Sequence, residues 1–448
     1  MTAALLRRVR VRWWILIFMF TFALMSFVQR TSVAVAADTF MPILHLSQVQ
    51  LGLLNTAFFA TYTAMQIPGG ALGQIWGARR TYVLVGVLSL AATLAMPLLS
   101  MAVTGAALFV SLLIAQLVLG VALAPVFPMF AAVVEAWFPT RQWAIANGLQ
   151  TSGMVIGGAV TPLVVVALTE SLGWRTALVL ATLPVAFLTV AWGRYGRNRP
   201  RQHPRVTATE LAELDSQADA APPLSWRRLG QIAANRDVLA LAFSYLCMNY
   251  AFYLLTYWSF LYLVQVRHFK GIESGIAGMI PWIGAAVGAA AGGFICDRCV
   301  QRWGARRGYR LVPLLCLPLA GALLLATVHV DKAYGAVAGL ALAFAAVEIN
   351  EGPYWAATMV AAGTDAGAAT GVLNTGGNLG GFLCQPLVAA LSASGHWDAA
   401  FETGTAFALA AAAAWLLVNC ERAGTRGPAT RGREGAASRG RPRSPELH

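Results

Sequence analysis

Charged residues are scarce in this sequence. Only 11% of the 448 residues are Asp, Glu, Lys or Arg, whereas a soluble domain carries about 25%. Hydrophobic residues make up 58% of the chain, and apolar stretches of about 20 residues, long enough to cross a bilayer as a helix, recur along it. These features exclude an ordinary soluble protein and predict an all-α protein that spans a lipid bilayer many times.

Acidic residues are fewer than basic ones, 19 against 32, which gives a net charge of +13. Such a charge could indicate a nucleic-acid partner. However, most of the basic residues lie in alternate loops between the apolar stretches, which is the positive-inside pattern. The charge therefore predicts topology, with both termini cytoplasmic in the plasma (inner) membrane, and no nucleic acid as partner.

Residue sets typical of catalysis or metal binding are also lacking. The six histidines fall in loops or at the edges of apolar stretches, and no Ser/His/Asp or His/Glu set lies within one. Cys296 and Cys299 have the spacing of a redox motif, but they end a predicted span rather than follow a βαβ unit. We therefore expect no enzyme activity, no metal and no cofactor.

Twelve spans are predicted from the apolar stretches. Six lie at about 13–37, 48–73, 81–101, 106–135, 142–168 and 174–193, and six at about 238–265, 273–296, 310–329, 333–361, 366–393 and 400–420. The predicted domains are a six-helix bundle over 1–193, a cytoplasmic loop over 194–237, a second bundle over 238–421 and a disordered basic tail over 422–448. Within the loop, Thr207 and Glu210 have capping-box spacing and predict a short amphipathic helix on the cytoplasmic surface.

The two halves carry an internal repeat. Gly69-Gly70 is followed by Trp76-Gly77-Ala78-Arg79-Arg80, and Gly292-Gly293 is followed by Trp303-Gly304-Ala305-Arg306-Arg307. Duplicated six-helix halves are typical of transporters, which bind substrate between the halves near the middle of the membrane.

One basic residue, Arg30, lies inside an apolar stretch. A charge in hydrocarbon costs about 2.5–3.5 kcal/mol, and no carboxylate stands next to Arg30 in the sequence. A planar guanidinium matches a carboxylate through two parallel hydrogen bonds, so we expect the missing partner to be a substrate carboxylate. The alternative is a structural arginine that binds backbone carbonyls or another helix.

Several segments together resemble a known family. They are Arg30–Ala37, Tyr62–Gly70, Pro125–Pro128 with Trp137–Pro139, Asn249-Tyr250, Glu351–Trp355 and Asn374–Gly381. With the repeated Gly-Gly…Arg-Arg loop, they resemble the major facilitator superfamily and, within it, the anion:cation symporters of sugar acids and other organic anions. The resemblance implies twelve helices in two pseudo-symmetric six-helix bundles, and it implies that Arg30 binds the substrate carboxylate.

Polar residues on other predicted spans could complete a substrate cavity, because several of them share helix faces or lie in the family-like segments. These candidates are Tyr62, Gln66, Asn249, Tyr250, Tyr253, Trp355, Asn374 and Asn378. Such groups suit a polyhydroxy acid, and the alternative is hydrogen bonding between helices.

Proton coupling has three candidate residues. Glu348 and Glu351 are three apart on one predicted span, and Asp38 ends the first. Acids inside a membrane usually relay protons or pair with a base; the alternative for Glu351 is bonding to backbone groups at a kink before Pro353. The acids that the family often places near the span 1 arginine and on span 4 are replaced by Gln29 and Leu123, and its span 4 arginine by Gln116.

The repeated loops differ in charge, with Gln74-Ile75 in the first and Asp297-Arg298 in the second. Asp297 can pair with nearby arginines and cap a helix start, so we expect it to bias gating. The gating candidates are Arg79, Arg80, Asp297, Arg298, Arg306 and Arg307.

The sequence therefore predicts a monomeric secondary active transporter that imports a small carboxylate together with a proton by alternating access. An exporter or facilitator of a drug-like or cationic solute is the alternative within transport. A transporter-like receptor is the alternative from another class.

Overall fold

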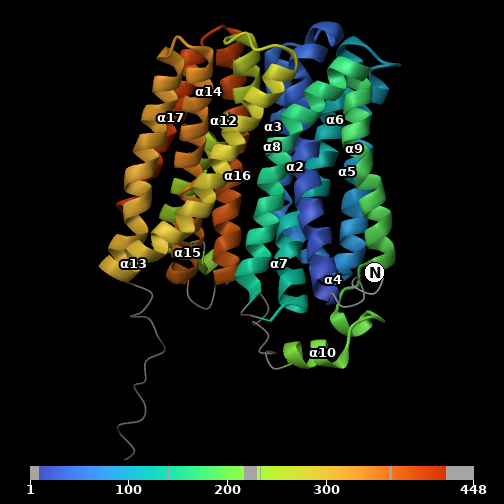
Figure 1. The fold of residues 1–448 in the computed structure, drawn as a ribbon, viewed down its shortest axis with the longest axis vertical. Coiled ribbons are helices and arrows are strands. Elements are labelled where there is room, and N and C mark those ends of the chain that lie inside the picture. The colour runs from blue at the N-terminus through green and yellow to red at the C-terminus, as the bar shows by residue number, and fades with distance from the viewer. Residues whose placement is uncertain (1–9, 140–141, 216–229, 233, 363–365, 420–448) are drawn as a thin grey trace, which may run out of the picture.

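The computed structural model is built from helices (Figure 1). It describes the chain except residues 1–9, 140–141, 216–229, 233, 363–365 and 420–448, so the predicted tail over 422–448 lies outside the described residues. In the described part every regular element is helical, which confirms the predicted all-α class.

The first half of the chain forms eight helices between residues 11 and 195. They are α2 (Val11–Leu44), α3 (Gln48–Ala64), α4 (Gln66–Trp76), α5 (Ala78–Leu99), α6 (Gly105–Leu123), α7 (Val126–Trp137), α8 (Trp143–Leu172) and α9 (Trp174–Tyr195). The predicted spans 48–73 and 106–135 are thus each broken into two helices.

The second half follows a linker that contains η2 (Pro200–Gln202) and α10 (Ala208–Asp215). Its helices are α12 (Arg236–Gln265), α13 (Gly271–His329), α14 (Ala333–Glu348), α15 (Glu351–Ala362), α16 (Ala366–Ala393) and α17 (Trp397–Trp415). Helix α13 covers the predicted spans 273–296 and 310–329, which meet at a kink where Gly304 has a φ of 77°. A positive φ is readily adopted only by glycine.

Proline explains the three breaks within predicted spans, which lie between α3 and α4, between α6 and α7, and between α14 and α15. A proline has no N–H to bond the carbonyl four residues earlier, and its ring crowds that carbonyl. Pro68, Pro128 and Pro353 each stand four residues after a break, at Ala64, Ala124 and Ile349 respectively.

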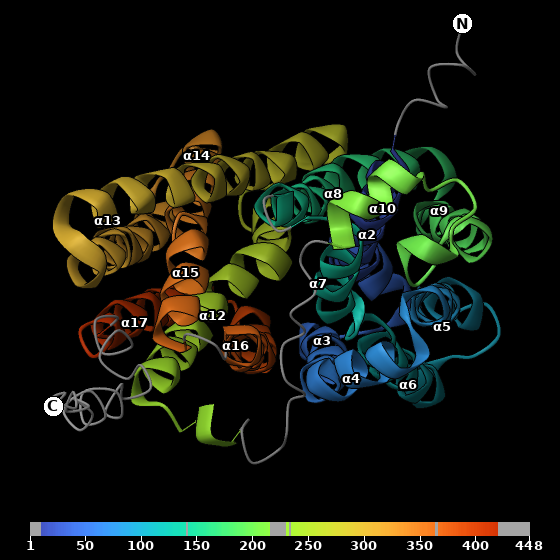
Figure 2. The ribbon, with the colours of Figure 1, turned by 90° about the horizontal axis from the view of Figure 1, so that it is seen from below.

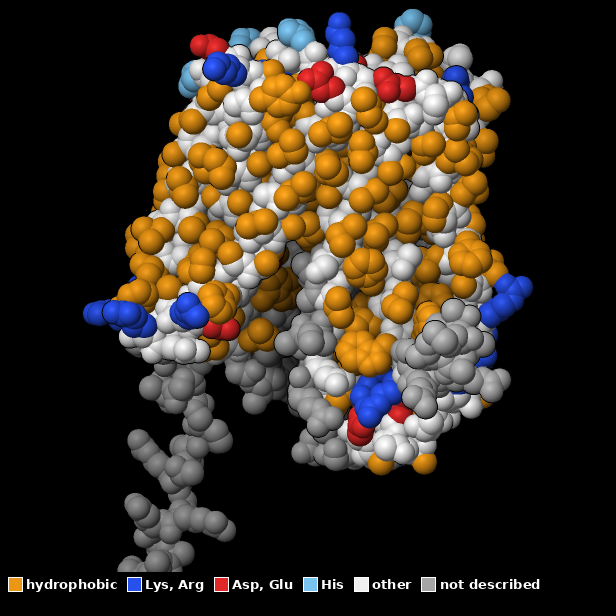
Figure 3. Space-filling view, in the orientation of Figure 1, with side chains coloured by type: hydrophobic (Ala, Val, Ile, Leu, Met, Phe, Trp, Pro, Cys, Tyr) orange, Lys and Arg blue, Asp and Glu red, His pale blue; other side chains and the backbone are white. Residues whose placement is uncertain are grey.

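The two halves form separate groups of helices, seen end-on in Figure 2. They meet most extensively where α8 packs on α13 and α3 packs on α16. At the ends of helices far from α10, Gln48 Nε2 donates a hydrogen bond to Gln265 Oε1 at 2.5 Å. Toward α10 the halves separate, and Figure 3 shows a hollow between them. We call the two ends the α10 side and the opposite side; the cleft opens on the α10 side.

The outer surface suits a lipid environment. Large apolar side chains point outward, among them Phe187 at 79% exposure and Val287 and Leu315 at 62%. They form a broad belt, with charged residues above and below it (Figure 3). By length and composition, eight helical stretches of the described chain could cross a membrane.

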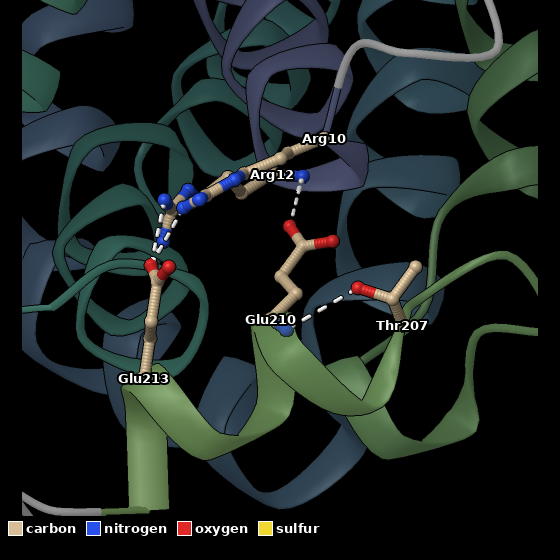
Figure 4. A network of polar contacts seen from close by, with 5 residues as sticks. All are labelled: Arg10, Arg12, Thr207, Glu210 and Glu213. Carbon is tan, nitrogen blue, oxygen red and sulfur yellow. Dashed lines mark hydrogen bonds and ion pairs between the residues drawn. The ribbon is translucent and has the colours of Figure 1, made fainter.

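The predicted linker helix exists as α10, and it binds the start of α2 (Figure 4). The Glu210 N–H donates to the Thr207 hydroxyl at 3.3 Å, and the Glu210 carboxylate accepts from the Arg12 N–H at 3.2 Å. Glu213 pairs with Arg10 at 2.6 Å and with Arg12 at 2.9 Å. Together these contacts fasten the linker to the first half of the protein.

Candidate functional site

Arg30 lies on α2, buried among the helices at 7% exposure. Its Nε and Nη2 atoms are buried and have no hydrogen-bond partner in the described part of the chain. The ion pairs described in the structure involve Glu213 and not Arg30. The guanidinium therefore keeps its charge without a protein counter-charge, which is a costly state for a buried ion.

Aromatic rings surround this guanidinium. Its carbon lies 4.8 Å from the ring centroids of Phe27 and Tyr62, 5.1 Å from Phe58 and 5.8 Å from Phe59. Each such cation–π contact is worth about 0.5–2 kcal/mol, depending on solvent exposure. The rings come from α2 and α3 and offset part of the desolvation cost, but they leave Nε and Nη2 without a hydrogen-bond acceptor.

The second half approaches Arg30 through α12. The phenol groups of Tyr253 and Tyr257 lie close enough to interact with the guanidinium. The ring of Phe59 lies 4.6 Å from that of Tyr253 and 5.7 Å from that of Tyr257. Arg30 is thus at the boundary between the two halves.

Two further polar contacts extend the site. The Tyr253 hydroxyl donates to Asn378 Oδ1 on α16 at 3.0 Å. Asn374, one turn earlier on α16, donates from Nδ2 to Gln66 Oε1 on α4 at 3.3 Å, across the halves. Asn378 Nδ2 and Gln66 Nε2 are buried without a partner among the described residues, so donors remain available on both sides of the boundary.

Asn249 and Tyr250 are neighbours in sequence but face different ways. Asn249 Nδ2 donates to the Tyr245 carbonyl at 2.9 Å, and it lies beside Gly377 of α16. The Tyr250 hydroxyl instead bonds Thr403 at 2.8 Å, and its ring stacks on Phe407 at 3.9 Å, both on α17. The structure therefore does not bring Tyr250 to the Arg30 cluster.

The acids of the predicted tenth span form a second cluster. Glu351 accepts hydrogen bonds from the Tyr245 hydroxyl at 2.7 Å and from Trp355 Nε1 at 2.6 Å. Glu348 is 1% exposed, and neither of its carboxylate oxygens has a hydrogen-bond partner among the described residues. Trp355 therefore belongs with the acids. Asp38 lies apart from them, half-buried on α2 two turns beyond Arg30.

The gating candidates lie at the α10 side and are exposed. Arg79 donates from Nε to the Gly193 carbonyl at 2.9 Å, and its N–H binds Asn198, so it joins α5 to the end of α9 within the first half. Arg298 lies over the Phe294 ring at 4.0 Å. The expectation that Asp297 caps a helix start is wrong, because α13 continues through it and turns only at Gly304.

Positions where this chain departs from the family pattern lie inside the first half. Gln29 Nε2 donates to the Thr93 hydroxyl at 3.4 Å. Thr93 and Gln116 line a small cavity between α2, α3, α5 and α6. Leu123 is buried at 2% exposure. Neutral groups thus fill this region.

Some residues of the site were not predicted. Phe27, Phe58 and Phe59 look in sequence like ordinary apolar residues of a span, and only the fold brings them to Arg30. Tyr245 could have been found from its spacing, because it stands four residues before Asn249 on one helix face. Tyr257 shares a helix face with Tyr253 in the sequence, and the structure places both at Arg30.

A membrane protein with two similar helical halves and a charged group at their boundary belongs to the class of transporters. The family model of the Major Facilitator Superfamily matches residues 15–384, and the chain belongs to this superfamily. It is accordingly a membrane transporter with the twelve-helix fold, and not an enzyme.

Several curated relatives match along most of their length. A "Probable sulfoacetate transporter" of Cupriavidus necator is 29% identical over 92% of this chain and 95% of its own. A "Probable galactarate/D-glucarate transporter" of Bacillus subtilis is 24% identical over 92% of each chain. The "Hexuronate transporter" of the same species is 26% identical over 76% of this chain and 78% of its own. The predicted resemblance to carriers of organic anions is confirmed.

The fold also matches solved structures. A bacterial homologue of the human lysosomal transporter Spinster, in an inward-facing and occupied conformation, superposes with a TM-score of 0.74 at 16% identity, over 92% of this chain and 97% of the other. At this identity the match concerns the fold alone.

Proposed function

We propose that the protein is a secondary active transporter of a small organic anion, with Arg30 as the group that binds its carboxylate or sulfonate. The observation that carries this proposal is the buried guanidinium at the boundary of the halves, with Nε and Nη2 unpartnered and no acid paired to it in the described structure. An anion bound there supplies both the missing charge and the missing acceptors. The relatives named above carry organic acids, which supports the same class of substrate.

The transport cycle is alternating access. The positive-inside pattern assigns the α10 side to the cytoplasm, so the described conformation is inward-facing. Contacts of α3 with α16 and of α8 with α13 close the opposite, outer side. An anion captured by Arg30 from outside is released into the cleft when the halves rock, and the direction is import across the plasma membrane, as a monomer.

The substrate contacts that we propose beyond Arg30 are supported by the polar groups near it. Tyr62 and Tyr253 lie at the guanidinium, Asn378 binds the Tyr253 hydroxyl, and Asn374 bonds Gln66 across the halves. Import is coupled to a proton, for which Glu348, Glu351 and Asp38 are the candidates. The exposed Asp297 and the arginines of the repeated loops bias the closing of the cytoplasmic side.

Uptake by the purified protein in liposomes tests this function. We expect labelled D-glucarate or sulfoacetate to enter, and an inward pH gradient to increase the uptake. Arg30→Ala removes a charge-assisted interaction of about 1.5–3 kcal/mol, so binding weakens by roughly 10- to 150-fold. Arg30→Lys keeps the charge but loses the planar group that forms two parallel hydrogen bonds. Its anion affinity is expected to lie between those of the wild type and Arg30→Ala.

The matched control is Arg302→Ala, which removes an exposed arginine on α13. It is expected to transport like the wild type. Transport that is equally unaffected by Arg30→Ala contradicts the role of Arg30. Binding of organic cations but no anions, measured by thermal shift, contradicts the substrate class.

A further inference from the structure

We propose that Glu348 and Glu351 form a proton-holding site inside the second half, separate from the anion site and linked to it by a polar stripe along α12. The role of this site in transport rests on the proposed function above. Its existence rests on the geometry of the two acids and can be tested without a transported substrate.

The two acids flank a break between two helices. α14 ends at Glu348 and α15 begins at Glu351. Asn350 stabilises the break by donating from Nδ2 to the carbonyls of Ala346 at 2.8 Å and Val347 at 3.0 Å. Gly352 packs against Gly293 of α13 so closely that an added Cβ would lie 3.0 Å from the Gly293 Cα. The carboxyl groups are therefore held near each other by tight packing on α13.

The surroundings of the pair contain no described basic group. The ionisable side chains that interact with it are Tyr245 from α12 and Tyr354 from α15. The faces of α13 and α16 that pack nearby present glycines, Gly293 toward Gly352 and Gly377 toward Tyr245. Two neighbouring carboxylates without a cation cannot both stay ionised in a low-dielectric interior, so the pair keeps at least one proton.

A proton suits this pair better than a metal ion. No group of three or more His, Cys, Asp or Glu side chains that could hold a metal occurs in the described part of the chain. Glu351 already accepts two hydrogen bonds, from Tyr245 and Trp355, as a carboxylate does. Glu348, with both oxygens unpartnered and 1% exposure, is then the acid that holds the proton in this conformation.

The pair reaches the accessible surface of the protein through Glu351, which is half-buried. Its partner Trp355 is 36% exposed, and α15, which packs on α13, α16 and α12, lies at the α10 side (Figure 1). When water reaches the pair, the proton of Glu348 passes to the Glu351 carboxylate and then to a water molecule; both carboxylates are ionised only while that water solvates them. The reverse transfer reloads the pair before the next cycle.

A stripe of polar residues joins the pair to the anion site. Tyr245, Asn249, Tyr253 and Tyr257 stand four residues apart on α12 and therefore share one face. Tyr245 binds Glu351, while Tyr253 and Tyr257 lie at Arg30. The eight residues from Tyr245 to Tyr253 span about 12 Å of helix. Because one rigid helix contacts both sites, a change in the hydrogen bond at Glu351 shifts the residues that face the bound anion.

Infrared spectroscopy tests the proton-holding site directly. Difference spectra between acidic and alkaline pH are recorded on the full-length protein in lipid vesicles. We expect a protonated-carboxyl band that Glu348→Gln removes and that Glu402→Gln, which changes an exposed acid on α17, leaves in place. Tyr245→Phe is expected to shift the frequency of the band, because Glu351 loses a hydrogen-bond donor. Spectra of Glu348→Gln and Tyr245→Phe that both equal the wild-type spectrum overturn the proposal.

Transport separates this inference from the proposed function. With D-glucarate or sulfoacetate as the probe, Glu348→Gln is expected to retain exchange of internal for external anion and to lose accumulation driven by a pH gradient. Gradient-driven accumulation at the wild-type level in this variant overturns the coupling role. If the wild type carries neither probe, the proposed function fails for these anions, and the infrared result alone decides whether the acid pair holds a proton.

Discussion

Gly52 on α3 offers a direct test of how the outer side closes. A Cβ added at this position would overlap the Cβ of Ala389 and lie 2.9 Å from the Gln385 carbonyl, both on α16. Any side chain larger than hydrogen therefore forces α3 and α16 apart. The contact exists only while the outer side is closed, so Gly52→Val is expected to shift the protein toward the outward-facing conformation.

The size of the shift follows from the packing. Insertion of extra carbon atoms into a well-packed contact costs about 1–3 kcal/mol. This cost falls on the described conformation and not on one in which the helices have separated, so the ratio of the two conformations changes by roughly 5- to 150-fold. Separation also breaks the hydrogen bond from Asn55 Nδ2 to Gln385 Oε1, which is 3.1 Å long and contributes about 0.5–1.5 kcal/mol.

Electron paramagnetic resonance can measure this change. Nitroxide labels are attached at Val49, at the start of α3, and at Ser394, beyond the end of α16, in a protein without its native cysteines; both positions are exposed. Gly52→Val is expected to populate longer distances between the labels. Gly52→Ala, which adds only the Cβ, is expected to do so to a smaller extent.

The matched control is Gly371→Val on α16. It carries the same change in helix propensity, but an added Cβ meets no atom within 4 Å, so the distances should equal those of the wild type. The reasoning is refuted if Gly52→Val and Gly52→Ala both fold and leave the distance distribution unchanged, or if Gly371→Val shifts it equally.

Three further predictions follow from single contacts. Tyr253→Phe removes the hydroxyl that binds Asn378 and should weaken anion binding by about 2- to 12-fold, for a loss of about 0.5–1.5 kcal/mol, whereas Tyr250→Phe, which faces α17, should leave the dissociation constant unchanged; equal effects in a binding titration would contradict the placement of both. Gln385→Leu removes the acceptor of two hydrogen bonds at the outer side and should populate the outward-facing conformation in the same resonance measurement. Hydrogen bonds from Arg12 and Arg10 lower the pKa of Glu213 below its ordinary value of 4.5. The ionised Glu213 therefore stabilises the fold above pH 4.5, and this contribution is lost as the pH falls through the lower pKa of the folded state. Amide exchange in α10 should accelerate under those acidic conditions, and in Glu213→Gln it should already be faster at neutral pH.

Most of the fold prediction rested on the apolar stretches and on the distribution of charged residues between them. Apolar length predicted the helical spans, and the Thr207 and Glu210 spacing predicted α10, because both depend on local chemistry. The breaks at Ala64, Ala124 and Ile349 were not predicted, although each precedes a proline by four residues. A proline within an apolar span can either kink the helix or end it, and the packing of neighbouring helices decides which.

The site was predictable where a residue violates its surroundings. Arg30 stands out because a charge in an apolar span needs a partner, and the structure leaves it buried with unused donors. Phe58 and Phe59 carry no such signal, since phenylalanine is common on lipid-facing and buried surfaces alike. The orientation of Tyr250 depends on the rotation of α12 against α17, which the sequence of one helix does not specify.

The breaks also indicate which half of the protein binds the anion and which half handles protons. Irregular backbone within a membrane protein occurs where it is buried or lines a cavity. Two of the three breaks carry polar groups. Gln66 follows the break between α3 and α4, and Glu348 and Glu351 flank the break between α14 and α15. The break between α6 and α7 consists of Ala124 and Pro125, which have no polar side chain. We infer that in this protein the first half supplies the charge that binds the anion, while the handling of protons has moved to the second half. Because α12 contacts both sites, its movement is the step at which anion and proton can be coupled.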